Sequence, residues 1–234
     1  MKQSVLVIGL GRFGTAAARE LMSLGHEVLV VDRDEARVND VAPDVTHAVQ
    51  ADASDEDALR SLGAGDFDHA IVAISGDAQP SIFATMALKN LGVKNVIAKA
   101  GTAIHGSILE RVGATRVVYP EREMGARVAH AFDTTHVIDY LDIAPGFGIV
   151  RFSPPPGWVG RTLRDIDLAG RFQLTPIALR RGGKVTVNPH RDEVVAASDE
   201  LVMIGLDENL EKLEGESAPT TRSSPGEDRP RVSR

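Results

Sequence analysis

The chain has 234 residues, and its 26 basic and 33 acidic residues give a net charge of −7, an unfavourable balance for nucleic-acid binding, which needs a basic surface. The sequence contains no cysteine, so disulfides, thiolate catalysis and cysteine-bound zinc are excluded. Its apolar runs are too short to span a bilayer and its first residues lack a signal-peptide pattern, so we expect a cytoplasmic protein that is not itself inserted in a membrane.

Up to about residue 120, short apolar runs alternate with segments of helical periodicity. The runs are mostly continuous, which is typical of parallel strands that are buried on both faces. This alternation predicts an α/β fold with a doubly wound parallel sheet. The predicted strands are 4–8, 27–31, 47–50, 69–74, 95–99 and 116–118, with helices between them.

The pattern changes after residue 120. A helix at 121–132 closes a predicted first domain of residues 1–133, and a linker or interface segment is expected at 134–144. Residues 145–206 are predicted to form a small α+β domain, with a terminal helix from 207 and a disordered polar tail after 213. The expected elements of this domain are strands at 148–152, 174–180, 184–187 and 200–204 and a short helix at 162–168.

Gly9, Gly11 and Gly14 form a G-x-G-x-x-G motif between the first predicted strand and helix. In such a motif the first glycine permits a tight turn, the second lets the backbone approach a diphosphate, and the third lets helix and strand pack closely. Asp32 ends the second strand, where its carboxylate can accept the hydroxyls of a ribose and would repel the 2′-phosphate of NADP; Arg33 weakens that repulsion. The motif predicts an adenine-nucleotide site, the alternative being glycines that serve only the turn.

Further residues near the predicted site carry charge. Arg12 lies within the glycine turn and offers a guanidinium to a terminal phosphate, unless it is simply solvated. Asp52 ends the third strand and can accept the adenine amino group or merely cap a loop, and Lys99 ends the fifth strand, facing either ligand or water. The predicted nucleotide-binding residues are Gly9, Gly11, Arg12, Phe13, Gly14, Asp32, Arg33, Asp52, Ala53, Ile74, Ser75 and Lys99.

Catalytic patterns are missing from the sequence. No histidines have metal-ligand spacing, and neither G-x-S-x-G nor G-x-x-x-x-G-K-[ST] is present. We therefore predict a binding protein without catalysis. The alternative is an NAD(H)-dependent oxidoreductase or an NAD(H)-sensing regulator, which would use the same glycine turn.

The segments "VIGLGRFG", "GHEVLVVDRDEARV", "VGATRVVYPEREMG" and "WVGRTLRDIDL" together resemble the cytosolic regulatory subunits of bacterial Ktr/Trk-type potassium uptake systems. This resemblance implies a Rossmann-like domain that binds ATP or ADP, or NAD(H) in some relatives, followed by a small second domain. It also implies homodimers that assemble into an octameric ring beneath a membrane potassium-conducting subunit, at the inner face of the membrane. The nucleotide would then gate that partner.

The resemblance also assigns roles to single residues. It places Arg12 at the terminal phosphate and Glu121 at a dimer interface, where its carboxylate would help to hold a divalent cation such as Mg²⁺; a plain acid at a helix N-terminus is the alternative. Ser75 replaces a glycine of the family pattern and is expected to crowd the adenosine. Some relatives bind cyclic di-AMP through an Asn–Ile pair, where this chain has Thr175 and Pro176, so the ligand of the second domain stays open.

Overall fold

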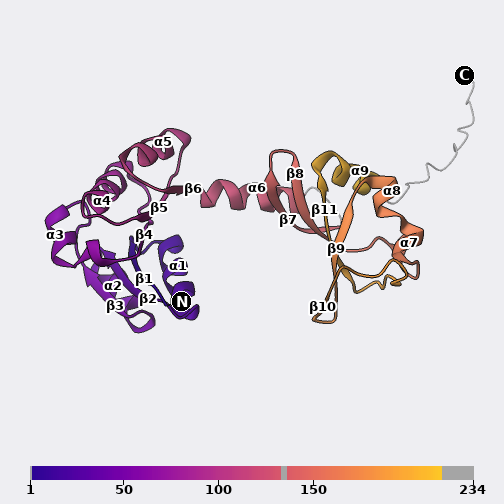
Figure 1. Ribbon diagram of the computed structural model, residues 1–234, viewed down its shortest axis with the longest axis horizontal. Helices are drawn as coiled ribbons and strands as arrows, with labels where there is room; N and C mark the ends of the chain where they lie inside the picture. Colours follow the sequence, from indigo (N-terminus) through magenta and orange to yellow (C-terminus); the bar gives the residue numbers. More distant parts are fainter. Residues whose placement is uncertain (1, 133–135, 218–234) are drawn as a thin grey trace, which may run out of the picture. The chain divides into compact units, whose positions relative to one another are not determined.

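The computed structural model describes residues 2–132 and 136–217, which form two compact units that divide between Glu123 and Met124 (Figure 1). Unit 1 precedes this division and unit 2 follows it. The predicted boundary after residue 133 is therefore not where the units separate, because helix α6 (Pro120–Phe132) contributes its first turn to unit 1 and its remainder to unit 2. Across the described residues, no helix combines the length and the apolarity needed to cross a membrane.

Unit 1 contains a six-stranded parallel sheet in the order β3-β2-β1-β4-β5-β6, which confirms the doubly wound fold. The predicted strands are all present, although β4 is shorter than predicted because Ala73 and Ile74 turn against Gly9. The strands are β1 (Ser4–Ile8), β2 (Glu27–Asp32), β3 (His47–Gln50), β4 (His69–Val72), β5 (Asn95–Lys99) and β6 (Arg116–Val118).

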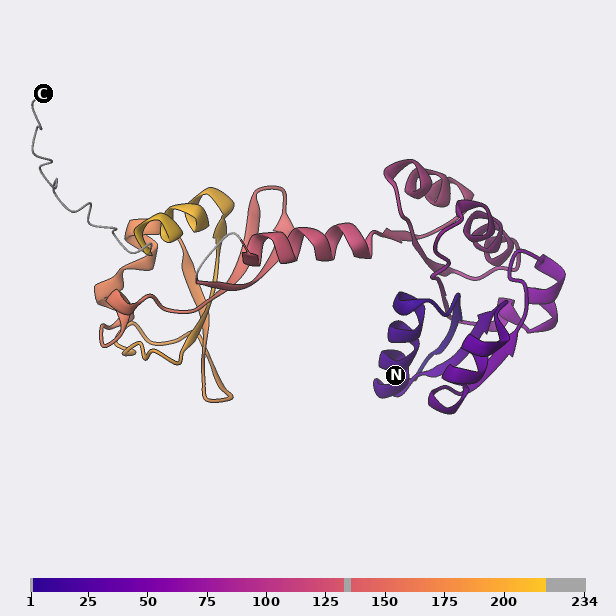
Figure 2. The ribbon, with the colours of Figure 1, turned by 180° about the vertical axis from the view of Figure 1, so that it is seen from behind.

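Helices cover both faces of this sheet (Figures 1 and 2). Alternate residues of β1 enter different cores: Val5 and Val7 pack with α1 and α2, whereas Leu6 and Ile8 pack with α3, α4 and α5. The chain leaves β1 toward α1 on one face and leaves β4 toward α4 on the other, so the two connections diverge at the carboxyl ends of these paired strands. The helices are α1 (Arg12–Ser23), α2 (Glu35–Val41), α3 (Glu56–Ser61), α4 (Ala78–Asn90) and α5 (Ala103–Val112).

Unit 2 is built on a five-stranded antiparallel sheet in the order β10-β9-β11-β8-β7, which confirms a small α+β domain. Its apolar core includes Phe152, Trp158, Ile166 and Met203. Gly182 and Gly183, both with positive φ, form the hairpin turn between β9 and β10. The elements are β7 (Val137–Ala144), β8 (Phe147–Phe152), α7 (Leu163–Ile166), α8 (Leu168–Phe172), β9 (Thr175–Arg181), β10 (Lys184–Val187), β11 (Glu200–Leu206) and α9 (Asp207–Ser217).

Two expectations for unit 2 are wrong. The segment 134–144, expected to be a linker or an interface segment, is not a linker, because Val137–Ala144 forms β7 and pairs with β8 along the sheet, while residues 134–135 lie outside the described residues; its role as an interface stays a prediction. The terminal helix runs to Ser217, beyond the predicted start of the disordered tail, and it belongs to the domain because Leu210 and Leu213 are buried in the same core. The rest of the predicted tail, residues 218–234, lies outside the described residues.

Candidate functional site

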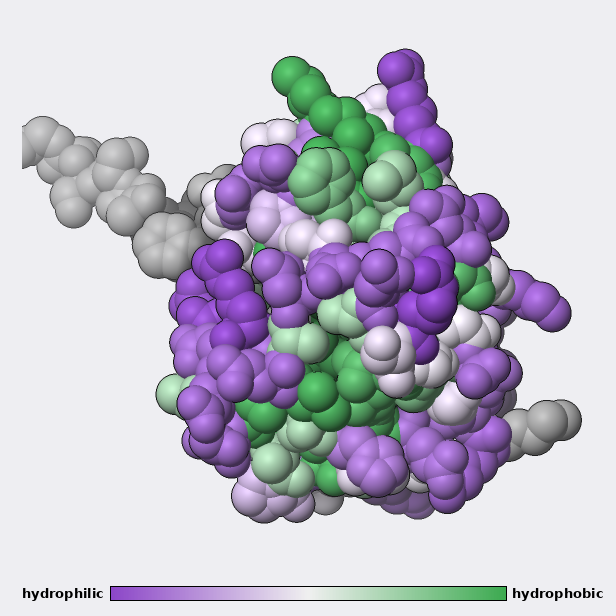
Figure 3. Space-filling model, turned by 90° about the vertical axis from the view of Figure 1, so that its left-hand side faces the viewer, coloured by the Kyte–Doolittle hydropathy of each residue, from purple (hydrophilic) through white to green (hydrophobic). Residues whose placement is uncertain are grey.

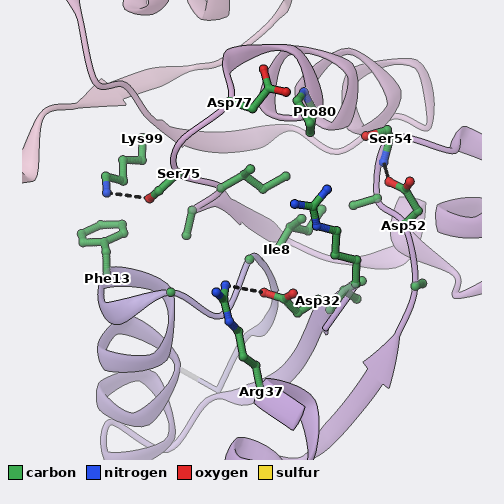
Figure 4. A pocket seen from close by; sticks show the side chains of 18 of the residues that line it. Ile8, Phe13, Asp32, Arg37, Asp52, Ser54, Ser75, Asp77, Pro80 and Lys99 are labelled. Carbon is green, nitrogen blue, oxygen red and sulfur yellow. Dashed lines mark hydrogen bonds and ion pairs between the residues drawn. The ribbon is translucent and has the colours of Figure 1, made fainter. Parts of the chain in front are cut away.

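A cavity of about 430 Å³ opens at the carboxyl ends of the unit 1 strands, where the connections after β1 and β4 diverge. Its size and its position at the switch point of the sheet are typical of ligand sites in this architecture. The turns after β1, β2, β3 and β4 and the end of β5 supply its walls (Figure 4), and the first turn of α6 adds Glu121. Every predicted site residue except Gly14 lines this cavity.

The three glycines of the turn differ in what their missing side chains allow. Gly9 has a φ of +94°, and a Cβ on it would lie 2.9 Å from the Ile74 backbone nitrogen. A Cβ on Gly14 would lie within van der Waals overlap of the Gly9 carbonyl oxygen, so Gly14 is needed for helix α1 to pack against the strand. A Cβ on Gly11 would meet no atom within 4 Å, and Gly11 lines the cavity. Gly9 and Gly14 therefore serve the fold, whereas Gly11 leaves space for a ligand.

Asp32, at the end of β2, is buried with 8% of its surface exposed. Its Oδ2 accepts a hydrogen bond from the Leu10 amide at 2.5 Å, and its Oδ1 accepts one from the Asp34 amide at 2.9 Å. The carboxylate thus holds the glycine turn against the start of α2. Each carboxylate oxygen retains acceptor capacity for a ribose hydroxyl, as the predicted role requires.

The Arg37 guanidinium lies beside Asp32 in the cavity wall, with its Nη1 3.9 Å from Asp32 Oδ2 and its Nε 3.4 Å from Asp34 Oδ2 (Figure 4). Arg37 was not among the predicted site residues. Its position three residues after the N-cap Asp34 is the available signal, because residues three apart share one side of a helix. Arg37 adds a second cation, after Arg33, to the ribose end of the cavity.

Asp52 lies at the rim of the cavity, where its Oδ1 accepts a hydrogen bond from the Ser54 amide at 2.9 Å (Figure 4). This contact forms a local turn and fixes the carboxylate at the mouth. Asp52 is exposed, so it remains available to a ligand. Asp77 and Pro80, at the start of α4, also line the cavity. They were not predicted, because the conformation of the loop between β4 and α4 determines whether the start of α4 reaches the site.

Lys99, at the end of β5, carries a buried ammonium group with 7% of the residue exposed. Its Nζ donates to Ser75 Oγ at 2.8 Å and to Glu121 Oε1 at 2.5 Å, and it lies 6.0 Å from the centroid of the Phe13 ring. The hydrogen bond from Lys99 lowers the pKa of Glu121 below its ordinary value. Ser75 turns toward Lys99, at the other end of the cavity from Asp52 (Figure 4).

Arg12 begins helix α1 and is exposed at the cavity wall. Within residues 2–132 and 136–217, its guanidinium has no hydrogen-bond or ion-pair partner. Its charge nevertheless contributes to the lowered pKa of Glu121, so the two side chains are close enough to interact electrostatically. A free guanidinium beside a helix N-terminus is suited to bind a phosphate group.

Glu121 is the residue predicted to hold a divalent cation. The described residues contain no group of three histidine or acidic side chains that could bind a metal ion. A cation at Glu121 would therefore need phosphate oxygens or water as its other ligands, which Mg²⁺ commonly uses. The role of Glu121 in binding a cation stays a prediction.

Comparison with known proteins identifies both units. Residues 5–120 match the TrkA-N domain, and residues 148–216 match the TrkA-C domain. The chain is 38% identical over 214 residues to the Ktr system potassium uptake protein C of Bacillus subtilis, covering 92% of this chain and 97% of that protein. It is 35% identical over 210 residues to the Ktr system potassium uptake protein A of the same organism, covering 90% and 95%.

Among solved structures, the GsuK RCK domain shares the fold, with a TM-score of 0.68 at 21% identity. That match covers 95% of this chain and 49% of the other. The sequence similarity to the two Bacillus proteins spans both units, and both domain types occur in the same order along the chain. The chain therefore belongs to the family of Ktr system potassium uptake proteins.

Proposed function

We propose that this chain is a non-catalytic regulatory subunit that binds ATP and ADP in the unit 1 cavity and thereby controls a membrane potassium-conducting partner. The observation that carries the proposal is the free guanidinium of Arg12 at the N-terminus of α1, in the part of the cavity wall where Glu121 pairs with the buried ammonium of Lys99. Arg12 and Lys99 are suited to bind phosphate groups, and the Asp32 carboxylate at the end of β2 is suited to bind a ribose, as a nucleoside polyphosphate requires.

Only differential binding can make such a site a switch. ATP and ADP share the base, the ribose and two phosphates, so contacts to these groups bind both ligands alike. A ligand with equal affinity for two conformations shifts neither, whereas a ten-fold preference is worth ~1.4 kcal/mol. Arg12, together with a Mg²⁺ ion held between Glu121 and the phosphates, is the proposed source of this difference.

We further propose assembly into dimers and an octameric ring, and exposed apolar side chains in unit 1 support this proposal. Phe83 and Met86 on α4 and Ile104 and Ile108 on α5 are exposed, Ile104 by 77%. On the side shown in Figure 3, apolar surface lies between hydrophilic residues. Apolar patches of this kind are commonly buried when copies of a chain associate. The ring would bind its membrane partner at the inner face of the membrane.

NAD(H) is the second candidate ligand. The cavity extends from Asp52, after β3, to Lys99, at the end of β5, so it spans both halves of the sheet as a dinucleotide requires. The GsuK channel, whose structure has a TM-score of 0.66 to this chain, binds NAD. At the far end, the cations Lys99 and Arg12 favour a phosphate over a nicotinamide.

Calorimetric titration with ATP, ADP and NADH tests the proposal. Arg12→Ala is expected to weaken ATP binding about ten-fold and to leave ADP binding nearly unchanged, because only the third phosphate loses a charged contact. Arg19→Ala on the same helix is the control, since Arg19 pairs with Asp44 outside the cavity. Equal losses for ATP and ADP, or binding of NADH alone, would contradict the proposal. Co-purification with a potassium-conducting membrane protein tests the partner.

A further inference from the structure

The ammonium group of Lys99 already has an anionic partner within the cavity. A buried cation needs a counter-charge, and the Glu121 carboxylate supplies it at 2.5 Å. Ser75 Oγ accepts a second hydrogen bond from the same ammonium. The hydrogen bond from Lys99 lowers the pKa of Glu121, so the Glu121 carboxyl is ionised at neutral pH. Any ligand phosphate that is to contact Lys99 must therefore compete with Glu121.

The two partners differ in how easily they can move. The side chain of Lys99 is 8% exposed and is packed at the end of β5, whereas the side chain of Glu121 is 68% exposed on the first turn of α6. Little covers Glu121, so its carboxylate can rotate away while the ammonium stays in place. The ammonium is also close to the N-terminal turn of α1, because it lies 6.0 Å from the Phe13 ring centroid. An anion at that turn is thus within reach of Lys99.

We propose that Glu121 competes with the terminal phosphate of the ligand for the Lys99 ammonium, so that a nucleoside triphosphate releases the first turn of α6. The inference rests on the proposed function, since it assumes a nucleotide in this cavity. Glu121 then acts as a specificity-determining residue: a ligand binds to Lys99 only if its anionic group outweighs one carboxylate. A phosphate with about two negative charges satisfies that condition better than a singly charged group.

In the part of the chain that the structure describes, no other hydrogen bond or ion pair joins a side chain of this turn to the sheet of unit 1, so breaking the Lys99–Glu121 pair would free the start of α6. Glu123 Oε1 accepts a hydrogen bond from the Tyr119 amide at 3.2 Å, and the Arg122 guanidinium stacks on the Tyr119 ring at 4.2 Å. These contacts stay within the start of the helix, whereas the Lys99–Glu121 pair links α6 to β5. Displaced from Lys99, the Glu121 carboxylate also becomes free to bind a divalent cation.

Two matched variants test the competition. Glu121→Gln removes the competing charge and keeps the shape of the side chain, and Glu123→Gln is the control on the same helical turn. ATP and ADP are titrated by calorimetry in the presence of EDTA, so that no divalent cation contributes. We expect Glu121→Gln to bind ATP about five-fold more tightly than the wild type, with a smaller gain for ADP and none for Glu123→Gln. An unchanged or weaker affinity of Glu121→Gln for ATP would overturn the inference.

Amide hydrogen exchange provides a second readout without ligand. The first turn of α6 in ligand-free Glu121→Gln should exchange as fast as in the ATP-bound wild type, and faster than in the ligand-free wild type. Equal exchange of the ligand-free wild type and variant would contradict the release. A wild type that gives no heat with either nucleotide would overturn the proposed function, whereas normal wild-type binding that Glu121→Gln fails to tighten overturns this inference alone.

Discussion

Asp32 and Leu10 are joined by a hydrogen bond of 2.5 Å from the Leu10 amide to the Asp32 carboxylate, which links the end of β2 to the glycine turn after β1. The residue predicted to bind a ribose is therefore also part of the framework of the site. A ligand that binds to Asp32 meets a carboxylate whose position is already set by two backbone amides. Such preorganisation reduces the entropy that binding must overcome.

This arrangement predicts that Asp32→Asn destabilises unit 1 in the absence of any ligand. The amide side chain keeps one acceptor oxygen, so one of the two backbone amides is left unpaired in a buried position. We expect a loss of about 1–3 kcal/mol in the free energy of unfolding, measured by urea denaturation. Asp40→Asn, on the surface of α2, should change it by less than about 0.5 kcal/mol. Equal stability of Asp32→Asn and wild type would restrict Asp32 to a role in ligand binding.

The second prediction concerns two glycine-to-alanine variants in the glycine turn, Gly14→Ala and Gly11→Ala. Gly14→Ala would place a methyl group in overlap with the Gly9 carbonyl, so we expect a loss of more than about 2 kcal/mol in stability. Gly11→Ala meets no protein atom within 4 Å and should melt like the wild type, while its nucleotide affinity falls at least about ten-fold. Thermal melts and calorimetry separate the two effects. Normal nucleotide binding by Gly11→Ala would show that the ligand does not approach this turn.

Sequence patterns were sufficient for unit 1 because its signals are local. Apolar runs mark strands buried on both faces, and G-x-G-x-x-G marks the turn between a strand and a helix. Strand β7 lies at the edge of its sheet, and Ile138 and Leu141 on it are exposed. Its sequence therefore lacks the continuous apolar run of a buried strand and resembles that of an irregular segment. The linker prediction failed for this reason.

The sequence predicts which residues lie at the site, but it does not predict which of their side chains form ion pairs. Each of Ser75, Lys99 and Glu121 follows or ends a predicted element, so the sequence places them at one edge of the sheet. That Lys99 pairs with Glu121 depends on how α6 leaves β6, which no short-range pattern encodes. Arg37 was missed for the related reason that its reach into the cavity depends on the turn between β2 and α2.

In unit 2, the third prediction concerns a buried ion pair. Asp199 is 2% exposed, and its carboxylate binds the Arg181 guanidinium through two hydrogen bonds of 2.7 and 2.8 Å. Its Oδ2 also accepts from the Ala196 amide, which fixes the loop before β11. We expect Asp199→Asn to lower the free energy of unfolding of this unit by about 2 kcal/mol, because a buried site loses the charge-assisted hydrogen bonds between its carboxylate and Arg181. Glu193→Gln removes a more exposed partner of Arg181 and should cost less than about 1 kcal/mol.

The same pair sets a dependence on acid pH. Burial raises the pKa of Asp199, but the hydrogen bonds from Arg181 and from the Ala196 amide outweigh burial and hold the pKa below the ordinary value of 3.8. A carboxyl group whose pKa is lowered in the folded state contributes its full stabilisation at pH values above its ordinary pKa of 3.8. This contribution is lost as the pH falls below 3.8 and through the lowered pKa of the folded state. Denaturation of the wild type between pH 5 and pH 2 should therefore be steeper than that of Asp199→Asn. Parallel acid profiles would contradict this contribution.

The fourth prediction concerns His105, on the first turn of α5. Its Nε2 lies 2.7 Å from Ser81 Oγ, and its Nδ1 accepts a hydrogen bond from the Gly101 amide at 3.5 Å. Ser81 Oγ in turn donates to the Ala78 carbonyl. The neutral imidazole with its proton on Nε2 satisfies all three contacts at once, which joins the start of α4 to the loop after β5. Protonation of Nδ1 would remove the acceptor for Gly101.

Burial lowers the pKa of His105 below its ordinary value of 6.5, so the folded state favours the neutral ring. The unfolded chain then takes up a proton at a higher pH than the folded chain does, and unit 1 should lose stability as the pH falls below 6.5. His105→Gln cannot be protonated and should show a flatter stability profile between pH 7 and pH 5, by urea denaturation. His47→Gln, an exposed histidine of the same unit, is the control. A profile of His105→Gln as steep as that of the wild type would assign the acid sensitivity to other groups.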